Sequence, residues 1–228
     1  MKPWGFKMYK SNCYRITNDI FQFFYYQLLT GGGACYVVFG AIPLCCDIMM
    51  PDKEYPRYMY HLNCFSKPLR PYVFQNTEEG INGFMTKLHH DFQAYMLPFF
   101  REAVDCVSAC GAVDKLEAQL DKHLFDSTGD PLTAKAYMLL KAGDHDEALE
   151  CFRIIMRERT NWATTNLNGQ DTVEGKREWE NTLQQTNDEW QQRISLLEDH
   201  DQEQISRWLF ENERKSLEAL GLLKPERN

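Results

Sequence analysis

Two apolar runs near the N-terminus, residues 20–29 and 34–46, form the strongest pattern of hydrophobic positions in this chain. Each run is rich in aromatic and β-branched side chains and is close to strand length. Residues 31–33 between them are all glycine, which permits the positive φ of a tight turn. The pattern therefore predicts a β-hairpin. Its first strand places large apolar side chains on both faces, so we expect other elements to cover both sides.

Weaker signals predict further strands around this hairpin. Residues 13–17 alternate in polarity, and Asn18 and Asp19 tolerate a left-handed turn, so a three-stranded antiparallel meander is expected. Prolines interrupt the region after the hairpin, which predicts mostly loop. Residues 58–65 are the candidate for one further edge strand.

The period of the pattern changes at Thr77, which is a candidate N-cap. Apolar side chains recur three and four positions apart across residues 81–96, as in an amphipathic helix. Pro98 is expected to stop or kink this helix and to begin a second one that ends at Gly111. Residues 114–124 are expected to continue as helix.

A helical hairpin is predicted next. Pro131 suits the start of a helix and Gly143 its end, while Asp144 and Glu147 have capping-box spacing for the following helix. Residues 136–159 resemble the middle of a tetratricopeptide repeat. Only one copy is visible and one unit cannot form a solenoid, so we expect a helical hairpin packed on the sheet.

The C-terminal part follows a polar segment, residues 160–170, which we interpret as a linker. Residues 171–228 carry an apolar stripe at helical spacing among Glu, Gln, Arg and Asp. The stripe falters at residues 199–201, which predicts two helices with a kink or turn between them. Three tryptophans lie on the stripe and need a covering partner, either the rest of the chain or another chain. They are Trp179, Trp190 and Trp208.

Together these patterns predict an α+β protein. An antiparallel sheet of three or four strands within residues 1–76 is covered by helices from residues 77–159, and the two form one domain spanning residues 1–159. The linker and the C-terminal helices of residues 171–228 complete the chain.

Charge and composition exclude several classes of protein. The net charge is −8, with +4 in residues 1–76 and −6 in each of residues 77–170 and 171–228. The acidic remainder would repel phosphates, so no nucleic acid is expected as a partner. No apolar run is long enough to cross a bilayer, and the start lacks a secretory signal. Most of the eight cysteines lie within apolar patterns, so we expect free thiols in the cytoplasm.

No motif assigns a reaction, and neither a cofactor nor a metal is expected. The glycine run precedes a strand, whereas phosphate-binding loops precede a helix. His89 and His90 are adjacent on a helix and point about 100° apart, so they do not share one metal ion easily. Cys106 and Cys110 are four positions apart on a helix and are interpreted as core residues. Enzymatic activity is therefore left undecided.

The candidate binding residues are few. Arg15, Gln22 and Gln27 are the polar residues that the apolar strands force inward, and Arg15 suits either an anion or an internal partner. The three tryptophans are candidate partner contacts. We expect a non-catalytic, cytoplasmic protein-interaction or regulatory module, with a protein partner or self-association through the C-terminal helices. The alternative is a small-molecule enzyme or ligand-binding protein with a pocket between sheet and helices.

Several short motifs in residues 4–105 resemble one known family. They are Gly5-Phe6-Lys7, Tyr14-Arg15, Gln27, Gly40-Ala41-Ile42 with Cys45, and Leu97-Pro98-Phe99-Phe100. In this spacing the chain resembles the domain-of-unknown-function family numbered 4304. The family has no assigned activity, so the resemblance implies no site residue.

Overall fold

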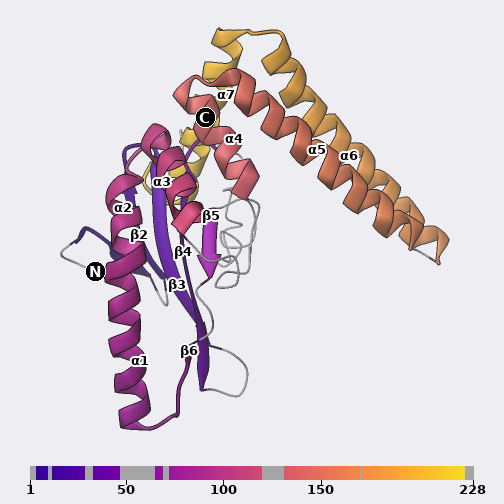
Figure 1. The fold of residues 1–228 in the computed structure, drawn as a ribbon. Coiled ribbons are helices and arrows are strands. Elements are labelled where there is room, and N and C mark those ends of the chain that lie inside the picture. Colours follow the sequence, from indigo (N-terminus) through magenta and orange to yellow (C-terminus); the bar gives the residue numbers. More distant parts are fainter. Residues whose placement is uncertain are drawn as a thin grey trace.

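The computed structural model combines one antiparallel sheet with helices, which confirms the predicted α+β class (Figure 1). It describes residues 4–9, 12–28, 33–46, 65–68, 72–119, 131–169 and 171–223. The strands are β1 (Lys7–Tyr9), β2 (Asn12–Thr17), β3 (Ile20–Leu28), β4 (Ala34–Pro43), β5 (Phe65–Pro68) and β6 (Tyr72–Val73). Their order in the sheet is β1-β2-β3-β4-β5, and β6 pairs with β4 beyond the end of β5.

The predicted meander is present as β2, β3 and β4. Asn18 has a φ of +48°, as its place in the tight β2–β3 turn requires. β3 and β4 pair along their length, from Ile20 opposite Pro43 to Leu28 opposite Cys35. The short strands β1 and β6 were not predicted. The strand expected at residues 58–65 lies outside the described residues except for Phe65, which begins β5.

Seven α-helices and one π-helical segment are described. They are α1 (Glu78–Asp91), the π-helical η4 (Phe92–Met96), α2 (Leu97–Glu102), α3 (Cys106–Gln119), α4 (Pro131–Ala142), α5 (His145–Asn168), α6 (Val173–Glu198) and α7 (Gln202–Ala219). Thr77 caps α1 as predicted, because its side chain accepts a hydrogen bond from the Gly80 amide. The helical path continues through Pro98, which lies in the first turn of α2, directly after a π-helical turn in which the Leu97 amide donates to the Phe92 carbonyl.

The predicted end of the second helix at Gly111 is wrong. α2 ends at Glu102, and α3 passes through Gly111 as an ordinary exposed position. Instead of one helix there are two, because a capping box starts a new helix at Cys106. Asp105 accepts hydrogen bonds from the amide and hydroxyl of Ser108, whose hydroxyl in turn accepts from the Asp105 amide.

The predicted α4–α5 hairpin is present, but the linker after it is not. Gly143 has a φ of +90° and ends α4, and Asp144 caps α5. α5 then continues to Asn168, so most of residues 160–170 are helix rather than linker. This part of α5 packs beside α6. Ala163 is buried, and Thr160 donates a hydrogen bond to Asn187 of α6. Packing between helices overrides the local polar composition.

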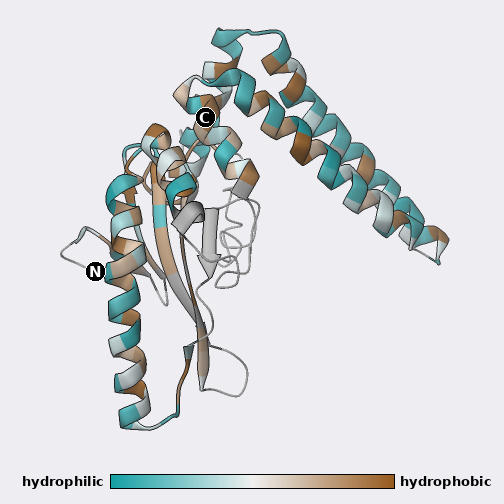
Figure 2. Ribbon diagram, viewed as in Figure 1, coloured by the Kyte–Doolittle hydropathy of each residue, from teal (hydrophilic) through white to brown (hydrophobic). Residues whose placement is uncertain are grey.

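Both faces of the sheet are covered, as the hairpin pattern predicts. One face, which includes Phe39, packs against η4, α2 and α3, and Phe100 of α2 belongs to this cluster. The other packs against α4, α5, α6 and α7 and includes Phe21 and Phe23. Apolar residues accordingly concentrate in the strands, while the helices turn many hydrophilic positions outward (Figure 2).

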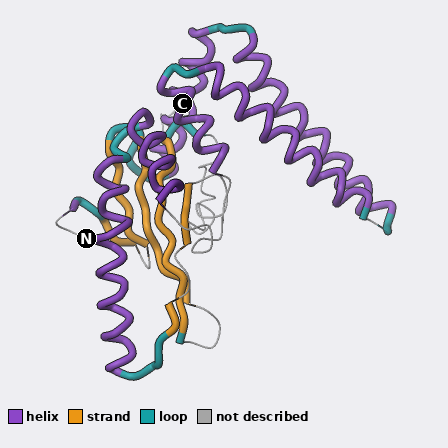
Figure 3. Tube along the Cα trace, viewed as in Figure 1, coloured by secondary structure: helices purple, strands orange, loops and turns teal. Residues whose placement is uncertain are grey.

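The C-terminal helices pack on the sheet domain at one end and project from it at the other. α5 and α6 run side by side as a long two-helix arm joined by a short loop at its tip (Figure 3). The predicted break at residues 199–201 is a turn, in which His200 has a φ of +53° and Asp201 caps α7. α7 returns to the sheet. Among the described residues, no helix has the length and apolar character that a bilayer crossing requires.

Candidate functional site

The inward-facing polar residues of the sheet bind the end of a helix. Gln22 is fully buried, and its amide nitrogen donates to the carbonyl oxygens of Phe100 (2.9 Å) and Ala103 (2.6 Å). Arg15 donates from Nε to the Gln22 side-chain oxygen (2.6 Å) and from Nη2 to Phe100 (2.7 Å). These groups satisfy carbonyls at the C-terminus of α2 that have no partner within the helix.

Arg15 is therefore an internal structural residue. Its Nη1 donates to the Trp4 carbonyl at 2.6 Å, and its guanidinium lies over the Phe6 ring at 4.8 Å. All three guanidinium nitrogens thus donate to carbonyl oxygens within the chain. Gln27 lies in β3 opposite Tyr36, and its side chain is outside the part of the structure described.

The buried cysteines are poor nucleophiles. A hydrogen bond with Cys45, together with burial, raises the pKa of Cys106 far above its usual value. Burial likewise raises the pKa of Cys110 to about 11 and raises the pKa of Cys151. Because the thiolate is the reactive form, these thiols behave as core side chains, as their helical pattern predicts.

The histidine pair lies in the last turn of α1. His90 lies 3.1 Å from Asp91, whose other oxygen accepts a hydrogen bond from the Tyr72 hydroxyl at 2.7 Å. Burial and the Asp91 carboxylate raise the pKa of Tyr72, so it remains a neutral donor. Within the described ranges, no group of three or more His, Cys, Asp or Glu residues has an arrangement suited to a metal ion. His61 and Cys64 lie outside those ranges.

The three stripe tryptophans have different surroundings. Trp190 is 1% exposed and lies between the guanidinium groups of Arg159 and Arg193, at 4.9 and 4.3 Å from its ring centre. Trp179 makes an edge contact with Trp162 on the arm, and Trp162 is 60% exposed. Trp190 is thus covered by its own chain and belongs to the core.

Trp208 lies where the core meets the surface. Its ring contacts Tyr137 and Phe152, at centroid distances of 5.5 and 6.3 Å, yet the residue is only partly buried. No described residue accepts a hydrogen bond from its indole nitrogen.

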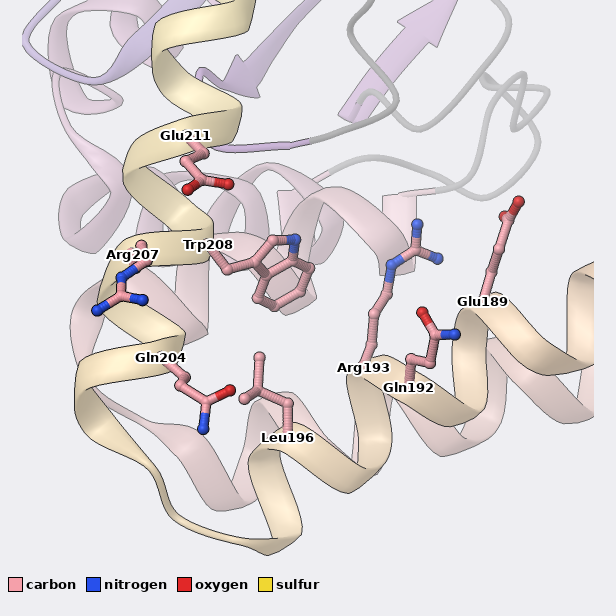
Figure 4. A pocket seen from close by; sticks show the side chains of 8 residues that line it. All are labelled: Glu189, Gln192, Arg193, Leu196, Gln204, Arg207, Trp208 and Glu211. Atoms are coloured by element: carbon pink, nitrogen blue, oxygen red, sulfur yellow. The ribbon is translucent and has the colours of Figure 1, made fainter.

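The outer side of the Trp208 ring belongs to a groove of about 350 Å³ between α6 and α7. The two helices diverge from the turn at residues 199–201, and Trp208 and Leu196 point toward one another from opposite walls (Figure 4). Each wall consists of residues at positions i, i+3, i+4 and i+7, which form one face of a helix. The wall residues are Glu189, Gln192, Arg193 and Leu196 on α6, and Gln204, Arg207, Trp208 and Glu211 on α7.

A second hollow, of about 480 Å³, extends the groove along α6. It shares Gln192, Leu196 and Gln204 with the first and adds Asp188 and Asp199 among its lining residues. The combined surface has an apolar floor and a polar rim. Leu196 and Trp208 form the floor, and the other lining residues are charged or polar.

Sequence reasoning identified Trp208 but not the groove around it. The other wall residues are mostly charged or amide side chains, which on an isolated helix indicate a solvated face. The available signal was the break at residues 199–201, because two helices joined by a tight turn bring their facing sides together.

The fold and this groove define an α+β protein with a helical surface groove. No family model, curated protein or solved structure matches the chain.

Proposed function

We propose that this protein is a non-catalytic protein-interaction module whose binding site is the groove between α6 and α7. The observation that carries the proposal is Trp208, an aromatic side chain anchored in the core on one side and open to the groove on the other. Tryptophan in such a position is typical of interaction hot spots, because the folded chain already holds the ring in place.

The alternative is a small-molecule enzyme or ligand-binding protein, which would need free polar groups in a pocket between the sheet and the helices. There, Gln22 and Arg15 bind backbone carbonyls, and the buried thiols have raised pKa values. These features favour the interaction module. The cytoplasm is the proposed location, because the seven cysteines in the described part of the chain are free thiols. The resemblance to the domain-of-unknown-function family numbered 4304 stays a prediction.

A photo-crosslinking residue in the groove tests the proposal. Placed at position 192 in the full-length protein inside its native cells, it is expected to give discrete protein adducts. The matched control is the same residue at position 184, two turns away on α6 and exposed. A groove-filling substitution, Gln204→Trp, should remove the adducts from position 192 without changing the melting temperature. Adducts that persist in that variant, or their absence from position 192, would count against the groove.

A further inference from the structure

The charges around the groove indicate the chemistry of its partner. Four carboxylates line the two hollows, whereas only two guanidinium groups do. Both guanidinium groups are engaged within the chain: Arg207 lies 2.9 Å from Glu203, and Arg193 lies over the Trp190 ring. The carboxylates are those of Asp188, Glu189, Asp199 and Glu211.

Glu211 is the clearest unmatched charge. Its carboxylate forms no ion pair or hydrogen bond with any residue that the structure describes. Figure 4 shows it on α7 about one turn beyond Trp208. Glu189 occupies the corresponding end of the other wall and receives a hydrogen bond from Gln185. A partner that brought further negative charge here would be repelled.

The order of residues along the walls places two glutamates at the same end of the groove. Leu196 and Gln204 lie nearest the turn between the helices, and Glu189 and Glu211 lie seven residues away along α6 and α7. At about 1.5 Å per residue, each carboxylate is about 10 Å along its helix from the turn end of the groove. Both carboxylates thus lie at the open end of the groove, on opposite walls, and the Trp208 ring and Leu196 form the apolar surface between the walls (Figure 4).

We infer that the groove binds a basic segment of a protein partner, in which one apolar anchor residue has a Lys or Arg on each side. The anchor packs on Trp208 and Leu196, and the two cations meet Glu189 and Glu211. The segment crosses the open end of the groove from one wall to the other, with its anchor between the two carboxylates. This inference rests on the proposed function and specifies the partner.

A second copy of this chain does not fit that description. The chain carries a net charge of −8, of which −6 lies in residues 171–228, so two such surfaces repel one another. Nucleic acid is disfavoured for the same reason. Charge complementarity thus selects a basic protein segment over both.

Three synthetic peptides test the inference. The first has a Leu with a Lys on each side and Ser elsewhere. In the second, Glu replaces both Lys residues, and in the third, Ser replaces the Leu. Binding is followed by the indole N–H signals of the five tryptophans of the ¹⁵N-labelled full-length protein. The Trp208 signal is identified by comparison with Trp208→Phe.

The first peptide is expected to shift the Trp208 signal, with binding at least tenfold tighter than that of the other two. Glu189→Gln with Glu211→Gln should weaken it about tenfold, and added salt should weaken it further. The matched control, Glu178→Gln with Glu180→Gln, makes the same charge change on the exposed side of α6 and should leave binding unchanged.

Equal or tighter binding of the Glu peptide, equal weakening by the control pair, or an unmoved Trp208 signal would overturn the inference. Its failure differs from failure of the proposed function. Crosslinks from position 192 without binding of the Lys peptide would leave an interaction module with another partner chemistry. The absence of both would remove the module as well.

Discussion

At the scale of single residues, the polar groups that look most functional in the sequence are structural. Gln22 and Arg15 join β2 and β3 to the end of α2 and bind carbonyls that the helix itself cannot satisfy. Because these groups are buried, the loss of one partner leaves the other without a hydrogen bond from either protein or water, which destabilises the fold. These residues hold the helix on the sheet rather than a ligand in a pocket.

Gln22→Leu is expected to lower the free energy of unfolding by about 3 kcal/mol, because it leaves the Ala103 carbonyl and the Arg15 Nε without their partner and removes one of the two donors to the Phe100 carbonyl. Chemical unfolding followed by circular dichroism measures the change. Gln93→Leu makes the same replacement at an exposed position and should change stability by less than about 0.5 kcal/mol. A Gln22 variant as stable as that control would show that the bonds contribute little.

At the scale of elements, helix boundaries follow their caps more than their composition. α3 begins where Asp105 and Ser108 form a capping box, and Asp19 from the β2–β3 turn also accepts a hydrogen bond from the Cys106 amide. From this start α3 continues to Gln119 and passes through Gly111. Likewise, α5 continues through a polar segment because α6 packs beside it.

Asp105→Ala should lower the free energy of unfolding by about 1 kcal/mol at neutral pH, since it removes this cap. Hydrogen bonds from Ser108 lower the pKa of Asp105 below its ordinary value of 3.8. The stabilisation is thus complete above that value and is lost as the pH falls through the lower folded pKa. Unfolding of the native protein and of Asp105→Asn, measured at several pH values, should show a stability difference that shrinks in acid.

Asp171→Asn is the matched control, because Asp171 is exposed and makes no hydrogen bond to the described residues. Its difference from the native protein should be small at every pH. A difference for Asp105→Asn that stays constant down to acid pH would contradict the role assigned to the carboxylate.

At the scale of the whole molecule, the C-terminal helices belong to the same core as the sheet. Trp190, Ile194 and Leu197 of α6 share a hydrophobic cluster with Phe21 and Phe23 of β3. The far part of the arm lies outside this cluster and projects from the body (Figure 1). The apolar stripe is therefore covered within the chain near the sheet.

Deleting residues 171–228 should abolish cooperative thermal unfolding, because it uncovers one face of the sheet and the buried side of α5. Differential scanning calorimetry measures the transition. As a control, replacing residues 161–185 by a short glycine-containing turn removes the far part of the arm and keeps the residues of α6 that contact the sheet. That variant should melt within about 5 °C of the full protein. A 1–170 fragment that melts like the full protein would refute the shared core.

The sequence by itself determined what local pattern controls. The meander, the cap at Thr77, the end of α4 at Gly143 and the turn at residues 199–201 all follow from strand alternation, helical spacing or the preferences of Asn, Thr and Gly. Covering of both sheet faces followed as well, because β3 carries large apolar side chains on both sides. These properties depend on neighbours along the chain.

Only the tertiary structure decided which polar and aromatic residues are free to bind. Gln22 and Trp208 both stand in apolar patterns, but one meets the end of α2 and the other meets a groove. The partners of the buried Gln22 amide come from a segment distant in sequence, and α6 and α7, although consecutive, each pack on a core built from distant segments. Their relative placement depends on the packing of the whole core, which no local pattern encodes.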